Sequence, residues 1–322
     1  MPMAINLGTY AVFAANNTSS IRVFSTRFNE EVQVTASDIL SSRKNHWGDY
    51  VAGVCRMLGY RNLGNGFDMF VNDDISSGGL SSSASFSVAI AMAAYAITNG
   101  RDLELQNSGE RLHLALLCQR AENEFVGVSC GIMDQASILI GGIIKLNCNT
   151  LAFEQIDQHF PQHSIVVMDT GKERTLAGSM YNQRVDEVNQ IRDRLKGSYQ
   201  FKDVAQLEPM VLEEASLLLQ EPVLEKRLRH IVTEEQRVLS AREAMKDGNM
   251  AQLGQLMNSS HESLAKDYEV TGEELDTITE LSKTCPGVAG SRMTGAGFGG
   301  CAISLIENQF IILIYLMALY RY

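Results

Sequence analysis

Two loops of small residues, each bordering an apolar segment, constrain this chain more than any other feature. One is Gly78-Gly-Leu-Ser-Ser-Ser-Ala-Ser85, which runs directly into the alanine-rich segment Phe86–Ile97. The other is Gly295-Ala-Gly-Phe-Gly-Gly300, which leads into the strand-like run Cys301–Ile306. Glycine allows backbone conformations and close approaches that other residues do not. A pair of loops rich in backbone and hydroxyl donors is typical of a site for a phosphorylated ligand.

Composition narrows the class of protein. The chain has 322 residues with 45% hydrophobic content, enough for one large domain or two ordinary ones without disulfide bonds. Its formal net charge of −11 argues against nucleic acid or an anionic membrane as a partner. The six cysteines form no C-x-x-C pair, and the N-terminus lacks the pattern of a signal peptide. We therefore expect reduced thiols in a cytoplasmic protein.

The order of predicted elements indicates an α+β fold of two domains. We expect strands at Ile21–Phe24, Phe67–Val71, Ile143–Leu146, Ser164–Met168 and Cys301–Ile306. We expect helices at Trp47–Leu58, Phe86–Ile97, Arg111–Phe125, Leu176–Leu195, Glu225–Lys246, Met250–Ser260 and Glu273–Lys283. These elements do not alternate as regular βαβ units, which excludes a simple parallel sheet. We place the domains at residues 1–160 and 161–322.

The C-terminal tail, residues 308–322, is unusually apolar. Its core, 310–320, is hydrophobic on all sides but shorter than the ~18–20 residues that a membrane span needs. Two interpretations remain open. The tail is either a buried strand or helix, or a segment unrelated to the fold.

The serine loop has the features of a phosphate site. A helix N-terminus carries unpaired N–H groups and a partial positive charge, so it attracts anions. Three consecutive hydroxyls add donors and one possible oxygen ligand for Mg²⁺. The loop is not a Walker loop, because Gly-Lys-Ser/Thr is absent. The alternative is a serine-rich cap on an ordinary core helix.

The glycine loop matches G-x-G-x-x-G, but its context does not fit a dinucleotide site. A Rossmann loop follows a strand and opens a helix, whereas this loop leads into a strand. A protein-kinase glycine loop does precede a strand, but no H-R-D or D-F-G follows in the sequence. We expect a glycine loop folded over another element, such as the serine loop.

Two acids flank a glycine-containing turn. Glu122 and Asp134 lie twelve residues apart, joined by Gly127–Gly131. Phosphoryl transfer needs a carboxylate to hold Mg²⁺ and a group that orients or deprotonates the acceptor hydroxyl, and these two acids suit those roles. Acids beside a turn are also common without any catalytic role.

Three aromatic residues have open interpretations. Tyr181, beside Asn182 near the start of a predicted helix, either binds a sugar hydroxyl or extends from the core with its hydroxyl at the surface. Trp47 and Tyr50 either stack on a base or belong to the core.

Several long motifs, in the same order, resemble the galactokinases among the GHMP small-molecule kinases. They are Gly79–Ser85, Ala121–Gly127, Cys130–Gln135, Leu256–Leu264 and Arg292–Cys301, with support from His46–Gly53, Ser179–Arg184 and Arg229–Glu234. The resemblance covers most of residues 1–306. It implies an N-terminal domain like domain 2 of ribosomal protein S5, a ferredoxin-like C-terminal domain, and an active site between them.

The resemblance also implies ATP-dependent phosphorylation of galactose at its C1 hydroxyl, and it assigns the residues. Gly78, Gly79, Leu80, Ser81, Ser82, Ser83, Ala84 and Ser85 would bind the ATP phosphates, Trp47 and Tyr50 would lie near the adenine, Ser83 and Glu122 would hold Mg²⁺, Asp134 would be the catalytic carboxylate, and Asp134, Gly131 and Tyr181 would contact galactose. We expect a monomer with galactose and ATP as its ligands.

The chain departs from the family pattern at three places. The family opens with Gly-Arg-x-Asn-Leu-Ile-Gly-Glu-His-x-Asp-Tyr, whereas this chain begins just after the point where that motif would end. Ile75-Ser-Ser77 stands where Pro-x-Gly is usual, and Ser87 replaces a glutamate. The sequence after Glu307 does not resemble the family. The resemblance therefore indicates a chain truncated at both ends.

The missing motif carries an arginine whose loss can lower the rate by several orders of magnitude. We therefore expect little or no turnover. Two alternatives remain: an inactive regulator that binds ATP or sugar, and a kinase acting on N-acetylgalactosamine.

Overall fold

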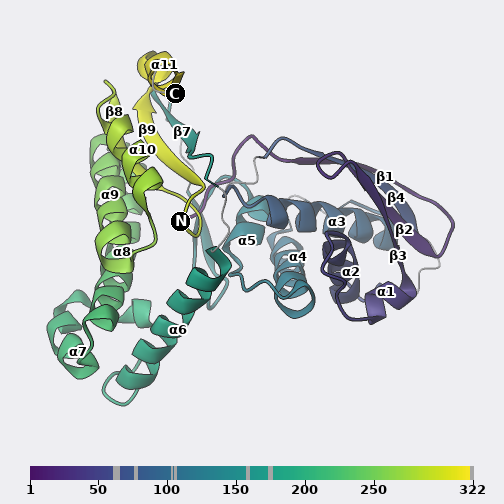
Figure 1. Cartoon of the computed structure of the whole chain (residues 1–322), viewed down its shortest axis with the longest axis horizontal. Coiled ribbons are helices and arrows are strands. Elements are labelled where there is room, and N and C mark those ends of the chain that lie inside the picture. The colour runs from purple at the N-terminus through teal and green to yellow at the C-terminus, as the bar shows by residue number, and fades with distance from the viewer. Residues whose placement is uncertain are drawn as a thin grey trace. The chain divides into compact units, whose positions relative to one another are not determined.

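The chain folds into two compact units. The computed structural model describes residues 1–60, 66–75, 79–102, 104, 107–156, 160–172 and 177–319, without the side chains of 177–179 and 317–319. The first unit comprises Met1–Ser77 and Ser81–Ile156, and the second comprises Asp157–Tyr322 with Gly78–Leu80 (Figure 1). Both units combine strands with helices, which confirms the predicted α+β class.

A mixed four-stranded sheet forms one layer of the first unit. Its strands are β1 (Thr9–Ala15), β2 (Ser20–Ser25), β3 (Glu30–Thr35) and β4 (Phe67–Asp73), in the order β1-β4-β2-β3. β4 pairs antiparallel with β1 and parallel with β2, while β2 and β3 pair antiparallel. The strands predicted in β2 and β4 are confirmed. β1 and β3 were missed because their side chains are mostly partly or fully exposed, which weakens the apolar signal.

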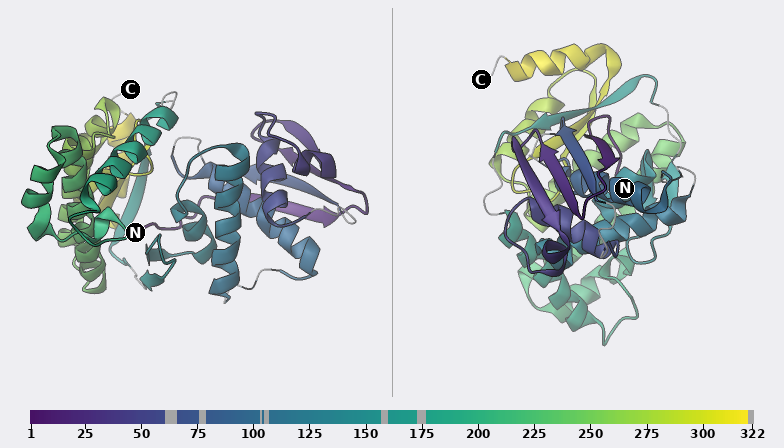
Figure 2. Two further views of the ribbon diagram at one scale, coloured as in Figure 1. Left: turned by 90° about the horizontal axis from the view of Figure 1, so that it is seen from below. Right: turned by 90° about the vertical axis from the view of Figure 1, so that its right-hand side faces the viewer.

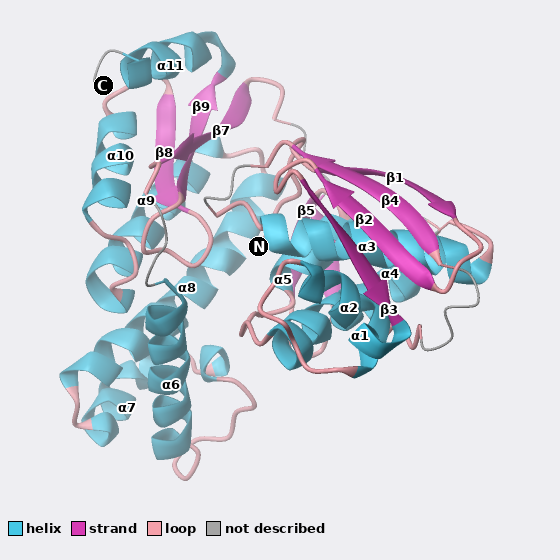
Figure 3. Ribbon diagram, turned by 45° about the vertical axis from the view of Figure 1, so that its right-hand side comes forward, coloured by secondary structure: helices cyan, strands magenta, loops and turns pink. Residues whose placement is uncertain are grey.

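Helices cover one face of this sheet (Figure 3). They are α1 (Ala36–Leu40), α2 (Gly48–Met57), α3 (Ser82–Asn99), α4 (Ser108–Arg120) and α5 (Met133–Ile140), and a hairpin of β5 (Ile143–Leu146) and β6 (Phe153–Ile156) follows. The helices and the inner sheet face share one core, in which Ile21, Phe67 and Ile90 are fully buried. The alanines of α3 allow it to be buried on most sides, as its sequence predicts.

The helix predicted at Arg111–Phe125 changes its geometry near its end. α4 stops at Arg120, and Ala121–Val126 continues as a π-helix, η1. Gly127 then turns the chain in the left-handed region with φ 80°. The N–H groups of Gly127 and Val128 both donate to the carbonyl oxygen of Glu122, at 2.8 and 2.9 Å. Such π-turns are rare and are frequent at functional sites.

The second unit contains a three-stranded antiparallel sheet. Its strands are β7 (His163–Asp169), β8 (Val288–Met293) and β9 (Cys301–Glu307), in the order β7-β9-β8. The predicted helices correspond to α6 (Ala177–Leu195), α8 (Pro222–Lys246), α9 (Met250–Ser263) and α10 (Glu273–Lys283). The shorter elements are η2 (Val204–Gln206), η3 (Pro209–Val211), α7 (Leu212–Leu219) and the π-helix η4 (Leu264–Tyr268).

α9 lies directly on β8. A Cβ added at Gly290 would stand 2.0 Å from the carbonyl oxygen of Gly254, so two glycines allow the backbones to approach. Both glycines are therefore required by packing within the unit.

The apolar tail forms η5 (Asn308–Phe310) and helix α11 (Ile311–Leu319), drawn in yellow in Figure 2. Ile314 is buried against Val166 and Ile306, whereas Ile312 is 72% exposed and Tyr315 is 58% exposed. The prediction of a buried strand is wrong, and among the described side chains up to Leu316 that of a buried helix holds for the side of α11 that carries Ile314. No helix in the described part of the chain is long and apolar enough to span a membrane.

Candidate active site

The serine loop enters α3 through a left-handed residue. Ser81 has φ 60° and Gly79 has φ 113°, while Gly78 lies outside the described residues. α3 begins at Ser82, and the Ser81 side chain makes no capping hydrogen bond. A left-handed conformation is unfavourable for any residue except glycine, and it is often found at functional sites. The interpretation of the loop as a simple serine cap is therefore wrong.

The residues of the serine loop differ in exposure and in whether their polar groups are already hydrogen-bonded. Ser83 is exposed, and Ser81 and Ser82 are half-buried. Ala84 is buried, and so is Ser85, whose hydroxyl donates to Thr9 Oγ1 at 2.8 Å and whose N–H donates to the Ser81 carbonyl oxygen at 3.0 Å. The polar groups of Ser85 are thus used in packing, in contrast to the role expected for it at the phosphates.

A buried carboxylate lies beside the loop. Glu122 is 2% exposed and accepts a hydrogen bond from Gln135 Nε2 at 2.8 Å, and the hydroxyls of Ser83 and Ser87 lie beside it. Burial raises the pKa of Glu122, and the nearby charge of Asp134 raises it further, while the hydrogen bond from Gln135 and the nearby hydroxyls of Ser83 and Ser87 lower it. The structure therefore brings Ser83, Glu122 and Asp134 together within the first unit.

Two buried oxygen atoms beside this carboxylate have no hydrogen-bond partner among the residues that the structure describes. They are Gln135 Oε1 and Ser87 Oγ; the latter faces Glu122 without completing a hydrogen bond of good geometry. Unpaired buried oxygens are costly unless water or a cation satisfies them. The described residues contain no group of three or more His, Cys, Asp or Glu side chains able to hold a metal. A hard cation would therefore use hydroxyl, amide and phosphate oxygens with Glu122, a donor set that suits Mg²⁺.

Asp134 is the exposed acid of the site. It lies in the first turn of α5, where the helix dipole favours a carboxylate. Gly131 is also exposed, and a Cβ there would meet no atom within 4 Å. Asp134 and Gly131 thus face open space.

Trp47, just before α2, and Tyr50, within it, both contact Phe86 on α3. Trp47 stacks on Phe28 at 5.2 Å between ring centroids, and its Nε1 donates to Glu30 at 2.8 Å. Phe86 makes edge contacts with both Trp47 and Tyr50. Burial raises the pKa of Tyr50 to about 12, with a further contribution from the charge of Glu122. Tyr50 therefore lies near the buried carboxylate.

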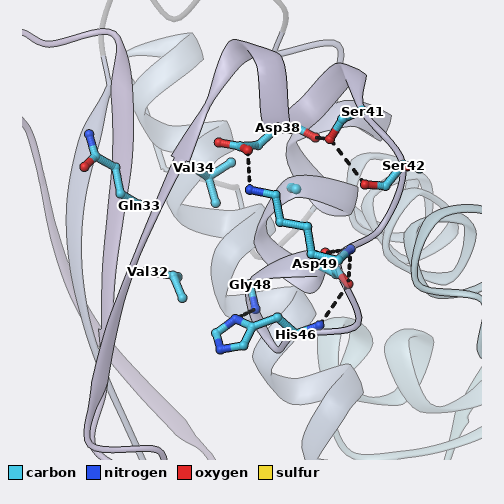
Figure 4. A pocket seen from close by; sticks show the side chains of 11 residues that line it. Val32, Gln33, Val34, Asp38, Ser41, Ser42, His46, Gly48 and Asp49 are labelled. Carbon is cyan, nitrogen blue, oxygen red and sulfur yellow. Dashed lines mark hydrogen bonds and ion pairs between the residues drawn. The ribbon is translucent and has the colours of Figure 1, made fainter.

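A small cavity of about 160 Å³ lies between β3, α1 and the start of α2 (Figure 4). Its charged lining groups are already paired. Asp38 accepts from Lys44 Nζ at 2.5 Å, which holds the pKa of Asp38 at about 2, and the Asp49 carboxylate accepts from the backbone N–H groups of Lys44 and His46. We assign no ligand to this cavity.

The glycine loop and Tyr181 belong to the second unit. The N–H of Phe298 donates to the Val270 carbonyl oxygen at 2.8 Å, and a Cβ at Gly297 would stand 2.1 Å from the same oxygen. At Gly297, glycine is therefore required by the packing of its own unit. Tyr181 is half-buried near the start of α6. The predicted first residue of this helix, Leu176, lies outside the described residues.

Below Tyr181, α6 carries a buried charge network that the sequence analysis missed. Glu187 accepts hydrogen bonds from the guanidinium groups of both Arg184 and Arg227, and all three residues are at most 6% exposed. The guanidinium of Arg184 also donates to the carbonyl oxygens of Tyr268 and Glu269. The network joins α6 to α8 and η4.

Three polar residues of the first unit also escaped the sequence analysis. They are Asn123, Gln135 and Ser87. Asn123 and Gln135 lie in the Ala121–Gly127 and Cys130–Gln135 motifs, and Ser87 stands where the family has a glutamate, but the sequence assigned no role to any of them. The fold shows their surroundings, because Asn123 bonds to Cys130 and Gln135 bonds to Glu122.

Two family models match the chain. The model of the GHMP kinases N terminal domain matches residues 49–142, and that of the GHMP kinases C terminal domain matches residues 241–310. The crystal structure of the Methanococcus jannaschii mevalonate kinase shares the fold, with a TM-score of 0.65 at 21% identity over 99% of this chain and 87% of that one. Fold and site together define a GHMP small-molecule kinase, which uses ATP as its phosphoryl donor.

Closer relatives narrow this class. The galactokinase of Lactobacillus helveticus is 36% identical over 317 residues, or 96% of this chain and 80% of its own length, and that of Enterococcus faecalis is 37% identical with the same coverage. The structure of Lactococcus lactis galactokinase complexed with galactose matches with a TM-score of 0.90 at 32% identity, over 98% of this chain and 81% of that one. The chain belongs to the galactokinase family.

Proposed function

We propose that this chain transfers the γ-phosphoryl group of ATP to the C1 hydroxyl of galactose. The observation that carries the proposal is the cluster of Ser83, Glu122 and Asp134, which combines a serine-rich helix N-terminus with one buried and one exposed carboxylate. Phosphoryl transfer depends on positioning and charge stabilisation, and this cluster provides both. The relatives named galactokinase, and the Lactococcus lactis structure that contains galactose, support the choice of sugar.

On the ATP side, backbone N–H groups from Ser82 to Ala84 and the hydroxyls of Ser81–Ser83 would bind the phosphates, together with Gly78–Leu80. These N–H groups lie in the first turn of α3, which leaves them without helical partners. Trp47 and Tyr50 would lie beside the adenine. Ser83 and Glu122 would hold Mg²⁺, which, when bound, neutralises charge on the transferring phosphoryl group.

On the sugar side, Asp134 would accept or orient the proton of the C1 hydroxyl. Its exposure in the first turn of α5 leaves the carboxylate free to do so. Gly131 and Tyr181 would contact galactose. We also propose that the protein is a cytoplasmic monomer with domains 1–160 and 161–322.

The test is galactose-dependent ADP release by the purified chain with Mg²⁺ and ATP. Asp134→Asn should lower kcat by about 10²–10⁴-fold, the range for loss of a general base, while ATP binding by calorimetry stays unchanged. Replacing galactose by N-acetylgalactosamine tests the sugar. Turnover of the wild type is expected to be slow, so the assay is compared with a protein-free control, and galactose-dependent ADP release no higher than that control would contradict the proposal.

A further inference from the structure

We propose that Asn123 is a positioning residue that fixes the loop before α5 and thereby sets the location of Asp134. The inference rests on the role proposed above for Asp134. Asn123 is exposed and touches neither acid through a hydrogen bond in the described structure.

The Asn123 side chain holds the loop between η1 and α5 by two hydrogen bonds to the backbone of Cys130. Its Oδ1 accepts from the Cys130 N–H at 2.8 Å, and its Nδ2 donates to the Cys130 carbonyl oxygen at 3.1 Å. Gln119 Nε2 donates to the same carbonyl oxygen at 3.2 Å. The peptide groups on both sides of Cys130 are thus held by side chains of α4 and η1.

The other end of the loop is fixed by the π-turn. The Glu122 carbonyl oxygen accepts from Gly127 and Val128, and the Glu122 carboxylate accepts from Gln135, the residue after Asp134. η1 therefore contains Glu122 and, through the Asn123 side chain, also holds the loop that leads to Asp134. The position of Asp134 relative to Glu122 depends on the hydrogen bonds between Asn123 and Cys130.

Asp134 needs such support, because its own carboxylate has no hydrogen bond or ion pair with the residues that the structure describes. Only its backbone places it, and a shift of about 1 Å in a reacting group can cost about 10²-fold in rate. Since Asn123 is exposed, its removal leaves the hydrophobic core intact and mainly frees the loop.

The kinetic test compares Asn123→Ala and Asn123→Asp with the control Asn147→Ala. Asn147 also accepts from backbone N–H groups in an exposed turn, but in the β5–β6 hairpin. Asn123→Ala should lower kcat about 10–100-fold with less than threefold change in the KM for Mg·ATP and a melting temperature close to that of the control. Asn123→Asp keeps the acceptor for the Cys130 N–H and should restore part of kcat. A kcat loss below twofold, or an equal loss in the control, would overturn the proposal.

A second readout does not need turnover. We call the two hydrogen bonds between the Asn123 side chain and the Cys130 backbone the Asn123 clamp. Cys130 itself is half-buried, and Cys148 is exposed and serves as an internal reference. Asn123→Ala should speed alkylation of Cys130 by iodoacetamide at least about tenfold relative to Cys148, measured by mass spectrometry, while Asn147→Ala should leave the rate at Cys130 itself unchanged. Unchanged alkylation of Cys130 overturns the clamp. Faster alkylation in a chain whose wild type releases no ADP supports the clamp and rejects the proposed function.

Discussion

At the scale of single residues, two serines of one loop have different roles: Ser83 is accessible to a ligand, and Ser85 is packed inside the fold. Ser83 is exposed and its hydroxyl lies beside Glu122, whereas Ser85 is buried and hydrogen-bonded to Thr9. Both lie in the first turn of α3, two residues apart. They therefore form a natural pair of variants.

Ser83→Ala should lower kcat at least about tenfold and raise the Mg²⁺ concentration for half-maximal rate, with little change in stability. Ser85→Ala should instead cost about 1 kcal/mol of stability through the lost hydrogen bond and change kcat much less. Steady-state kinetics and urea denaturation of both variants check this. The reverse pattern would mean that Ser85, rather than Ser83, serves the phosphates.

His230 allows a prediction on pH. It is buried, stacks on Tyr268 at 4.5 Å and shares a hydrogen bond with Ser263, and burial lowers its pKa to about 4. In the unfolded chain a histidine has a pKa of about 6.5, so the unfolded state binds more protons between these values.

The stability of the second unit should therefore be full above pH 6.5 and fall as the pH drops from 6.5 toward 4. The loss from this group is on the order of 3 kcal/mol. His230→Gln should remove most of that slope, which urea unfolding at pH 7.5, 5.5 and 4.5 would measure. An unchanged slope would show that His230 is protonated in the fold or that other groups dominate.

Residue roles were predicted from sequence where a motif contained them. Glu122 and Asp134 stand in such motifs, and the structure brings both near Ser83. The unpaired oxygens of Ser87 and Gln135, and the use of Ser85 in packing, depend on neighbours from other elements. Sequence patterns contain no information on such contacts.

At the scale of elements, α6 and α8 are joined by charges instead of apolar packing alone. Glu187 is shared by Arg184 and Arg227, and all three are buried. Glu187→Gln should destabilise the second unit by about 3–5 kcal/mol, because it leaves two buried guanidinium groups without their carboxylate. Urea denaturation with an unchanged m-value would measure the loss.

Asp193→Asn is the matched control on the same helix. Asp193 pairs with Lys196, and both side chains are more than half exposed, so this variant should change stability by less than about 0.5 kcal/mol. Equal effects of the two variants would contradict the role of burial in the network.

Helices were predicted better than strands because of how each element is buried. α2 and α10 turn their apolar side chains toward a core with helical periodicity, and α3 is a continuous alanine-rich apolar run. β1 pairs with the distant strand β4 and β3 pairs with the preceding strand β2, while the side chains of both stay largely exposed. The π-turn Ala121–Val126 was read as an ordinary helix because its sequence is equally compatible with α geometry.

At the scale of the whole molecule, ligand binding should appear as stabilisation. A ligand that binds only the folded state adds RT ln(1 + [L]/Kd), about 2.7 kcal/mol at one hundred times Kd. Mg·ATP should therefore raise the melting temperature in a concentration-dependent way, and Ser83→Ala should reduce the rise. A melting temperature independent of Mg·ATP would contradict nucleotide binding by this chain.

The sequence alone determined the α+β class, most of the helices and the two acids of the site. It could do so because helical periodicity, glycine-rich loops and acids beside a turn are patterns of neighbouring residues. Only the tertiary structure decided which serine hydroxyls are available, which oxygens lack partners, and which side chain closes the loop before Asp134. Those properties depend on the path of the chain in three dimensions: Ser85 bonds to Thr9 on a different element, and Asn123 reaches Cys130 because the chain turns at Gly127.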